Sequence, residues 1–176
     1  LRNRAGITAT ALGNDCGNFD VGPLCLAVNA RYTNSATAHE VAGVVTAAYR
    51  VAPGLRLGAF ADYAFNRISQ TARLRQRDSL PMFGGFVGLA PRDDGLGLQL
   101  RISAAYSSEG VTMTRSDALE TTEGGYGSSK LVSWAVGGEA AYGFAISKQI
   151  QIAPYLGLRY SDSSRQGYSE QPTGDV

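Results

Sequence analysis

The segment from Ser129 to Tyr160 alternates between apolar residues and small or polar residues over two long stretches. Side chains of a β-strand point alternately to its two faces, so a period of two residues predicts strands and not helices. Residues 147–149 between the stretches are polar, which predicts a tight turn joining two antiparallel strands. Each stretch is long enough for the roughly 9–11 tilted residues with which a strand crosses a bilayer.

Aromatic residues lie near the ends of the apolar face of these strands. Trp134 is at one end of the first strand, Tyr142 and Phe144 are at its other end, and Tyr160 is at the far end of the second. Strands of outer-membrane barrels carry an apolar band between two such aromatic girdles. The predicted girdle residues are Tyr32, Tyr49, Tyr63, Phe65, Tyr106, Trp134, Tyr142, Phe144 and Tyr160.

Five earlier segments, 24–33, 39–51, 55–66, 82–90 and 96–106, also read as strands, which makes seven in all. The facing of 82–90 stays open, because Phe83, Val87 and Leu89 compete with Met82 and Phe86 for the apolar face. No charged residue falls on the apolar face of the other strands. A charge facing lipid costs roughly 2–4 kcal/mol near the midplane, so this distribution indicates a membrane barrel. The predicted lumen-facing residues are Arg31, Glu40, Arg50, Arg56, Asp62, Arg101, Glu139 and Arg159.

The links between the strands alternate in length. Those at 52–55, 91–95 and 147–149 are short, whereas 67–81 and 107–128 are long polar segments, and 34–38 is a short exception on the same side as the long ones. Transmembrane barrels have short periplasmic turns and longer extracellular loops. The sequence therefore predicts an all-β fold, a partial antiparallel up-and-down transmembrane barrel, with its long loops outside the cell.

The chain divides into three predicted parts: a linker or lumenal segment at 1–23, barrel strands at 24–160, and a surface loop at 161–176. Residues 1–12 are predicted to be a short helix or an irregular linker. Cys16 and Cys25 are the two cysteines of the chain, and one histidine cannot complete a metal site with them. A disulfide between them is expected, and it implies an oxidising compartment such as the periplasm.

Composition excludes several classes of function. A net charge of +1 over 176 residues gives no reason to expect nucleic-acid binding, and no run of about 18 apolar residues predicts a transmembrane helix. His39, at the start of a strand, is interpreted as an interfacial side chain, and no nucleophile–base set can be assembled around it. We expect no enzymatic activity, no cofactor and no metal. The pair Asn14-Asp15 is interpreted as a turn former rather than a cleavage site.

Three runs of sequence resemble the β-domains of autotransporters, the type V secretion family. They are AYGFAISKQIQIAPYLGLRYSDSSRQGYSEQ at 141–171, VTAAYRVAPGLRLGAFAD at 45–62 and LRISAAYSSEGVTMTR at 100–115. The resemblance implies a twelve-stranded barrel in the bacterial outer membrane, threaded by an N-terminal helix and joined to a passenger domain that it helps to export and display. Outer-membrane lipid, the passenger and the barrel-assembly machinery are the implied partners. Because only seven strands are predicted, further strands are expected after Val176.

Two alternatives to the translocator remain open from the sequence. A small porin or adhesin-like barrel would have the same strands without a passenger. A soluble lipocalin-like carrier would also alternate, but with its apolar face turned inward around a cavity.

Overall fold

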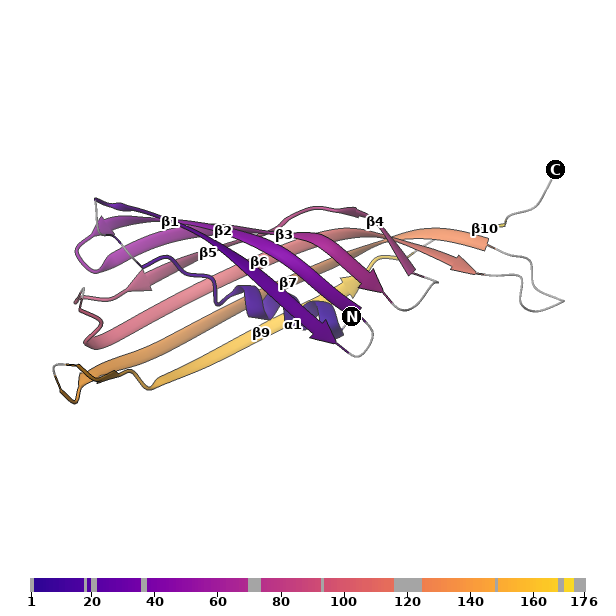
Figure 1. The fold of residues 1–176 in the computed structure, drawn as a ribbon. Coiled ribbons are helices and arrows are strands. Elements are labelled where there is room, and N and C mark those ends of the chain that lie inside the picture. The colour runs from indigo at the N-terminus through magenta and orange to yellow at the C-terminus, as the bar shows by residue number, and fades with distance from the viewer. Residues whose placement is uncertain are drawn as a thin grey trace.

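A computed structural model describes residues 2–17, 19, 22–35, 38–69, 74–92, 94–115, 125–147, 149–167 and 170–172. Almost all of this part of the chain is antiparallel β-sheet, and the one helix is α1 (Arg2–Ala11). Seven long strands run up and down in the order in which they occur in the sequence, as predicted (Figure 1). They are β1 (Leu24–Ser35), β2 (Ala38–Ala52), β3 (Leu55–Ser69), β5 (Met82–Leu89), β6 (Gly97–Arg115), β7 (Gly125–Ala145) and β9 (Tyr155–Arg165).

Three short strands lie on the same sheet: β4 (Leu74–Ser79), β8 (Gln151–Ile152) and β10 (Glu170–Pro172). The sheet is curved but not closed, because β1 and β9 each pair with one strand among the described residues. One end of the sheet holds the links β2–β3, β5–β6 and β7–β8, and we call it the turn end. The opposite end is the loop end. The all-β up-and-down fold predicted from alternation is thus confirmed as a partial barrel wall.

The strands are longer at the loop end than the sequence predicts. The segment 107–128, predicted as a loop, continues β6 as far as Arg115 and begins β7 at Gly125, with a ladder that runs to the Arg115–Gly125 pair. Within the predicted loop at 67–81, β3 extends to Ser69 and β4 pairs with β6. These loop predictions were wrong because backbone pairing does not need apolar side chains. The polar extensions lack the alternation on which the predictions rested.

The predicted boundary between the last barrel strand and the C-terminal loop, at residue 160, also needs a correction. Residues 161–165, predicted as loop, extend β9 along β7, and β10 pairs with the start of β7. The predicted strand 150–160 is instead divided into β8 and β9 around Pro154, which has no N–H to donate. The register is the same on both sides of the break, and the Tyr142 N–H donates to the Pro154 carbonyl oxygen at 3.1 Å. Residues 168–169 and 173–176 lie outside the described residues.

Helix α1 lies in the hollow of the curved sheet, against β6, β7 and β9 (Figure 1). Thr8, Ala11 and Leu12 are buried, and this spacing of three and four residues puts them on one helical face. Among the described residues no helix is long and apolar enough to cross a membrane. The sequence left residues 1–12 open between a short helix and an irregular linker, and the structure has a helix at Arg2–Ala11.

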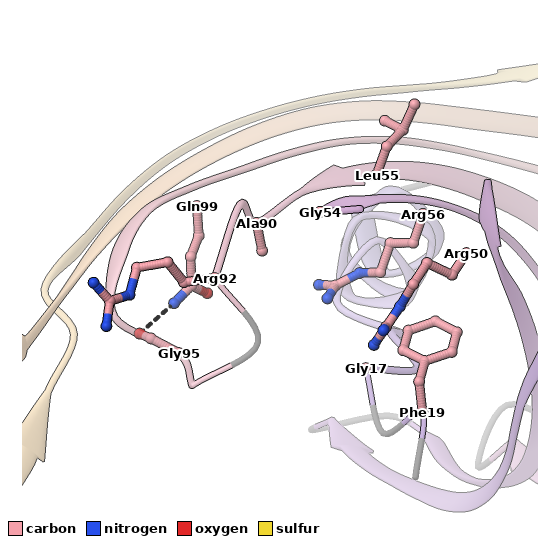
Figure 2. Close-up of a pocket in the computed structure, with 10 residues that line it drawn as sticks. All are labelled: Gly17, Phe19, Arg50, Gly54, Leu55, Arg56, Ala90, Arg92, Gly95 and Gln99. Carbon is pink, nitrogen blue, oxygen red and sulfur yellow. Dashed lines mark hydrogen bonds between the residues drawn. The ribbon is translucent and has the colours of Figure 1, made fainter. Parts of the chain in front are cut away.

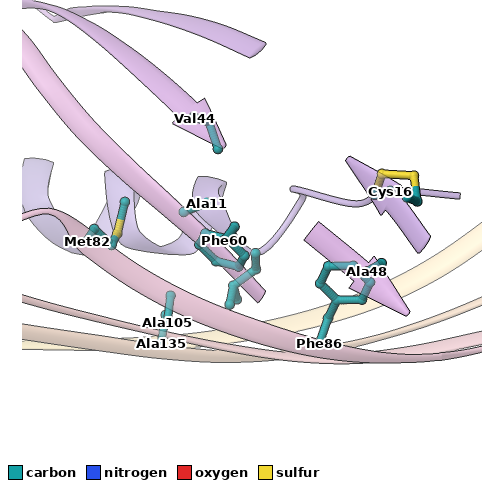
Figure 3. Packing of buried hydrophobic residues seen from close by; sticks show 11 residues of the cluster. Ala11, Cys16, Val44, Ala48, Phe60, Met82, Phe86, Ala105 and Ala135 are labelled. Atoms are coloured by element: carbon teal, nitrogen blue, oxygen red, sulfur yellow. A yellow bond between two sulfur atoms is a disulfide. The ribbon is translucent and has the colours of Figure 1, made fainter. Parts of the chain in front are cut away.

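A small apolar core fills the concave side of the sheet (Figure 3). Phe60 lies beside Ala11 at the end of α1, whereas Phe86, from the neighbouring strand, lies beyond the helix near Ala48, and Met82 and Ala105 belong to the same cluster. The core settles the facing of β5, which the sequence left open. Met82 and Phe86 are buried on the inner face, whereas Phe83, Val87 and Leu89 are exposed on the outer face.

Candidate functional site: a charged inner face behind an apolar outer face

The outer face of the sheet is a continuous apolar surface. Leu26 is 69% exposed, Val28 78%, Ile102 70% and Leu158 78%, although they lie in the middle of regular strands. Monomeric soluble proteins rarely expose contiguous apolar patches of this kind. A lipocalin-like carrier would turn this face inward, so the observed facing argues against the soluble alternative.

The predicted aromatic residues all lie exposed on this outer face. Tyr106 is directly opposite Trp134 in the β6–β7 ladder, and the ring centroids of Trp134 and Tyr160 are 5.4 Å apart near the loop end. At the turn end Tyr142 and Phe144 pack with centroids 4.7 Å apart. Trp134 and Phe144 are ten residues apart, about 34 Å along a strand, or about 26 Å in height at a tilt of about 40°. This height is close to the apolar band of roughly 25 Å in outer-membrane barrels.

Sequence reasoning missed one member of the loop-end row. Phe83 of β5 is directly opposite Tyr106 of β6, so Phe83, Tyr106 and Trp134 form an aromatic row across three strands. Phe83 is 55% exposed on the outer face. The signal was present but ambiguous, because β5 carries large apolar residues on both faces.

The inner face carries the predicted charged residues, and near the loop end three of them form one network. The Arg31 guanidinium donates to both carboxylate oxygens of Asp62, through Nε at 3.0 Å and Nη2 at 3.0 Å. Nη2 also donates to Glu40 Oε1 at 3.1 Å, and Nη1 donates to the Thr33 hydroxyl at 2.8 Å. The Asp62 and Glu40 side chains are 2% and 4% exposed. A bidentate guanidinium–carboxylate pair of this geometry fixes β1 against β2 and β3.

Towards the turn end, inner arginines hold the segment that follows α1, residues 12–17, which we call the exit segment. Arg56 Nη2 donates to Asp15 Oδ2 at 2.7 Å, and Arg101 Nη1 is 3.5 Å from the same oxygen. Arg101 also donates to the Leu12 and Gly13 carbonyl oxygens at the end of the helix. A cation there compensates the unpaired carbonyls and the negative end of the helix dipole.

A disulfide adds a covalent connection at the same place. Cys16 and Cys25 are bonded, with Cα atoms 5.9 Å apart, and both are buried. The bond ties the residue after Asp15 to the first turn-end residues of β1. Helix α1 and its exit segment are therefore fixed in the hollow by one covalent bond and two arginines.

The remaining predicted charges lie on the same inner face. Arg50 lies over the Phe19 ring, with Cζ 4.7 Å from the centroid. Glu139 faces Arg101 across the β6–β7 ladder, and its carboxylate is 3.9 Å from Arg159 Nη2. Arg159, on the last long strand, is the most exposed of the set.

Two sequence interpretations need an addition. Asp15 was interpreted with Asn14 as a turn former, but its carboxylate also pairs with two strand arginines far along the chain. Nothing in the local sequence shows this, because the pairing depends on the path of the exit segment through the hollow. The Asn14 side-chain nitrogen is buried without a hydrogen-bond partner. His39 lies in β2 opposite Asn34, and its side chain is outside the described set.

The inner face is electrically polarised along the strands. Among the described side chains, the loop end has Arg31 with three carboxylates, of Glu40, Asp62 and Glu109, around one small cavity. The turn end has Arg50, Arg56, Arg101 and Arg159 with Asp15 and Glu139. Carboxylates thus outnumber arginines at the loop end, and arginines outnumber carboxylates at the turn end.

An apolar outer face with aromatic rows, behind which a charged inner wall holds a helix, defines the wall of a transmembrane β-barrel with a segment inside it. The autotransporter beta-domain family model matches residues 29–175. The chain therefore belongs to the autotransporter beta-domain family, whose members are outer-membrane β-barrels of type V secretion. No curated protein and no solved structure matches the chain.

Proposed function

We propose that this chain is the translocator and anchor domain of an autotransporter, which helps to export a passenger and holds it at the bacterial surface. The passenger is joined on the N-terminal side of α1. The family supports the translocator role in general. The passenger and its display are the part that the proposal adds.

The observation that carries the proposal is the way in which the inner face holds α1 and its exit segment. Arg56 and Arg101 both contact Asp15, and Arg101 also donates to the carbonyl oxygens of Leu12 and Gly13, directly after α1. A polypeptide held along the inside of a barrel wall is the arrangement that a chain would leave after passing through the lumen. A porin without a passenger keeps a water-filled lumen, which a helix held against the inner wall would obstruct.

Three partners belong to the proposal. Outer-membrane lipid would contact the apolar outer face, and the many exposed large apolar side chains of that face support this role. The passenger would continue from α1. The barrel-assembly machinery would insert the strands, because an open strand edge in lipid leaves unpaired N–H and C=O groups at several kcal/mol each.

The proposed topology places the turn end in the periplasm and the loop end outside the cell. It is tested with two matched variants, Gln149→Cys at the turn end and Gln166→Cys at the loop end, in a background with serine at positions 16 and 25. A membrane-impermeant maleimide should label position 166 on intact cells, and position 149 only after the outer membrane is permeabilised. The opposite pattern would invert the topology.

Export is tested by placing an epitope on the N-terminal side of Leu1 in the full encoded protein. Expressed in a Gram-negative host, the epitope should be digested by protease added to intact cells. Ile102→Arg puts a charge on the lipid-facing surface and should impair membrane assembly, so the epitope of this variant should stay largely protected. An epitope that stays protected although the barrel is folded in the outer membrane would contradict passenger display and favour the passenger-free barrel.

A further inference from the structure

The Cys16–Cys25 disulfide closes a short loop where the exit segment meets the sheet. Cys16 belongs to the exit segment and Cys25 is the second residue of β1, so the two thiols are nine positions apart in the sequence. The loop between them contains Gly17, Gly22 and Pro23, residue types that favour turns. Closing this loop requires no strand pairing, because both sulfur atoms belong to one local segment. The bond can therefore form before the sheet exists.

In the folded protein both cysteines are inside the molecule. Cys16 is 4% exposed and Cys25 is 5% exposed, and both belong to the apolar core on the concave side of the sheet (Figure 3). Phe19, which lies within the loop that the bond closes, packs against the same core. A disulfide donor must approach a cysteine sulfur directly in order to exchange with it. Burial to this degree prevents that approach in the folded state.

The turn-end cavity beside the loop does not restore access to the sulfur atoms. It has a volume of about 350 Å³, and Gly17, Phe19 and Arg50 are among the residues that line it (Figure 2). The Arg50 guanidinium lies over the Phe19 ring, with Cζ 4.7 Å from the centroid. Neither Cys16 nor Cys25 lines the cavity, although the structure describes both. A space of this size can hold a small molecule but not the active-site surface of a folded protein.

The backbone around the disulfide is also engaged. Cys25 is paired with Ala48 in the β1–β2 ladder. The Cys16 N–H donates to Asp15 Oδ1 at 2.8 Å, and the other carboxylate oxygen of Asp15 accepts from Arg56. Before another protein could exchange disulfides with this pair, the exit segment or the start of β1 would have to leave these partners.

We propose that a protein disulfide donor makes the Cys16–Cys25 bond before the exit segment docks on the inner face of the sheet. The proposal rests on the proposed function in one respect, which is the passage of the chain through the periplasm. That compartment is kept oxidising by proteins that donate disulfides. Docking then buries the finished bond and protects it from reduction. The order of the two events is fixed, because the docked form gives the donor no access to either thiol.

The reaction is a thiol–disulfide exchange in two steps. The thiolate of one cysteine attacks a sulfur of the donor disulfide, which gives a mixed disulfide and releases one donor thiolate. The thiolate of the second cysteine then attacks the chain's own sulfur in the mixed disulfide, which closes the Cys16–Cys25 bond and releases the second donor thiolate. Overall the chain loses two electrons and two protons, and the donor takes up both as it becomes a dithiol.

The order is tested on the full encoded protein, with any cysteine outside residues 1–176 replaced by serine. The reduced chain is either kept unfolded in dilute urea or folded in non-ionic detergent, and each sample is mixed with an oxidised thioredoxin-fold protein as the donor. Alkylation with a polymer-linked maleimide counts the remaining thiols. Because a buried group reacts only through a rarely populated opening, the folded sample should be oxidised at least about a hundredfold more slowly. Oxidation of both samples at the same rate would overturn the proposal.

The matched control is an exposed thiol, added by Gln149→Cys in the β7–β8 turn with serine at positions 16 and 25. It is compared with Cys16→Ser, which leaves the Cys25 thiol alone. The probe is a thioredoxin-fold protein whose single active-site cysteine carries thionitrobenzoate, so that formation of the mixed disulfide releases a coloured thiolate. Folding should leave the rate of the Gln149→Cys variant nearly unchanged and should suppress the rate of Cys16→Ser. Equal rates of the two folded variants would contradict the protection of Cys25.

If the reduced chain does not fold, the reverse reaction decides, because it passes through the same mixed disulfide. A reduced thioredoxin-fold protein should reduce the disulfide-bonded wild type in dilute urea and leave the folded wild type intact. Reduction of both forms at the same rate would show that the folded bond is accessible.

The order in cells is read by pulse-chase labelling of the full encoded protein. The disulfide should appear before the heat-modifiable form of the barrel. A heat-modifiable barrel that still has both thiols free and acquires the bond later would reverse the order. Thiols and barrel are read on the same gel whether or not a passenger reaches the surface, so failure of this proposal is distinguishable from failure of passenger display.

Discussion

Phe60 and Gly84 lie directly opposite each other in the β3–β5 ladder, and the Phe60 ring occupies the space that a side chain at position 84 would need. Gly58 and Phe86 repeat the arrangement two residues away with the strands exchanged. Each ring covers the exposed backbone of the opposite glycine, as aromatic residues do in pairs that stabilise glycine-containing strands. The Phe60–Gly84 and Phe86–Gly58 pairs thus let both rings pack into the core on the inner face.

Gly84→Ala should therefore destabilise the folded sheet. A Cβ at position 84 would stand 2.6 Å from the Ala104 carbonyl oxygen as well as against the Phe60 ring, so backbone and ring must both shift. We expect a loss of about 1–3 kcal/mol in the free energy of unfolding, measured by urea titration in detergent. The control is Gly138→Ala on the exposed outer face, where the nearest atom is 4.0 Å away. Equal losses in both variants would show that the Phe60–Gly84 contact is not the cause.

Ile102 provides the sharpest test of the outer face as a lipid contact. It is 70% exposed and lies midway along β6 between Leu98 and Tyr106. Ile102→Arg should cost roughly 2–4 kcal/mol of folding free energy in phospholipid vesicles, because the charge would lie near the bilayer midplane. Gln99→Arg adds the same charge on the inner face, where Gln99 lines a cavity of about 350 Å³ at the turn end, and it should assemble almost normally. Assembly of both variants to the same extent would contradict the assignment of Ile102 to the lipid-facing surface and of Gln99 to the inner face.

For most strands, the sequence alone could predict which face turns towards lipid, because charged residues are excluded from that face. A charged residue such as Arg101 next to an apolar residue such as Ile102 leaves one arrangement that avoids a charge in lipid. β5 has no such residue. With Phe83 on one face and Phe86 on the other, only the glycine opposite Phe86 and the packing of the core on the concave side determine which ring is inside.

The parts of the candidate site that sequence could not predict depend on contacts between distant segments. Arg56 was predicted to face the lumen, but its partner Asp15 is 41 residues away in a segment without regular structure. The polar ends of β6 and β7 were missed for a different reason. Outside the apolar band neither face of a strand is selected for hydrophobicity, so the alternation that identifies a strand is absent there.

The Cys16–Cys25 bond should stabilise the folded state. The cysteines are nine residues apart, and closing a loop of this size stabilises by about 3 kcal/mol in the chain-entropy account. The double serine variant should lose about this much unfolding free energy, and reduction of the wild type should have the same effect. Intact-mass measurement of the unreduced protein should show two hydrogens fewer than the reduced form. Two free thiols in the folded, unreduced protein would contradict the bond.

Asp94 in the β5–β6 link should titrate well below an ordinary aspartate. Hydrogen bonds from Arg92 and from the Leu96 N–H lower its pKa from 3.8 to about 2. Because the folded pKa lies below the unfolded value, the interaction contributes to stability above about pH 4 and is lost as the pH falls towards 2. Carboxyl-carbon NMR should show a midpoint near pH 2, and Arg92→Gln should raise it. An unchanged midpoint in Arg92→Gln would mean that the arginine does not hold the carboxylate.

The last prediction concerns the buried network at the loop end. Arg31 makes the bidentate pair with Asp62 and also contacts Glu40, and both carboxylates are almost fully buried. Removing one partner of a buried ion pair leaves an uncompensated charge, at a cost of about 3–5 kcal/mol. Arg31→Met keeps much of the side-chain volume and should lower the unfolding free energy by about that amount. In this variant β1 should also be the first strand to separate from the sheet, and faster amide hydrogen exchange of residues 26–32 would detect this.

Arg159→Met is the matched control for this change. Its pair with Glu139 is longer, at 3.9 Å, and both side chains are at least one-third exposed. Exposed pairs contribute about 0–1 kcal/mol, so this variant should be almost neutral. If Arg31→Met is also nearly neutral, the Asp62 and Glu40 carboxylates must be solvated or protonated in the folded barrel. The ion-pair network would then not be the interaction that fixes β1 to its neighbours.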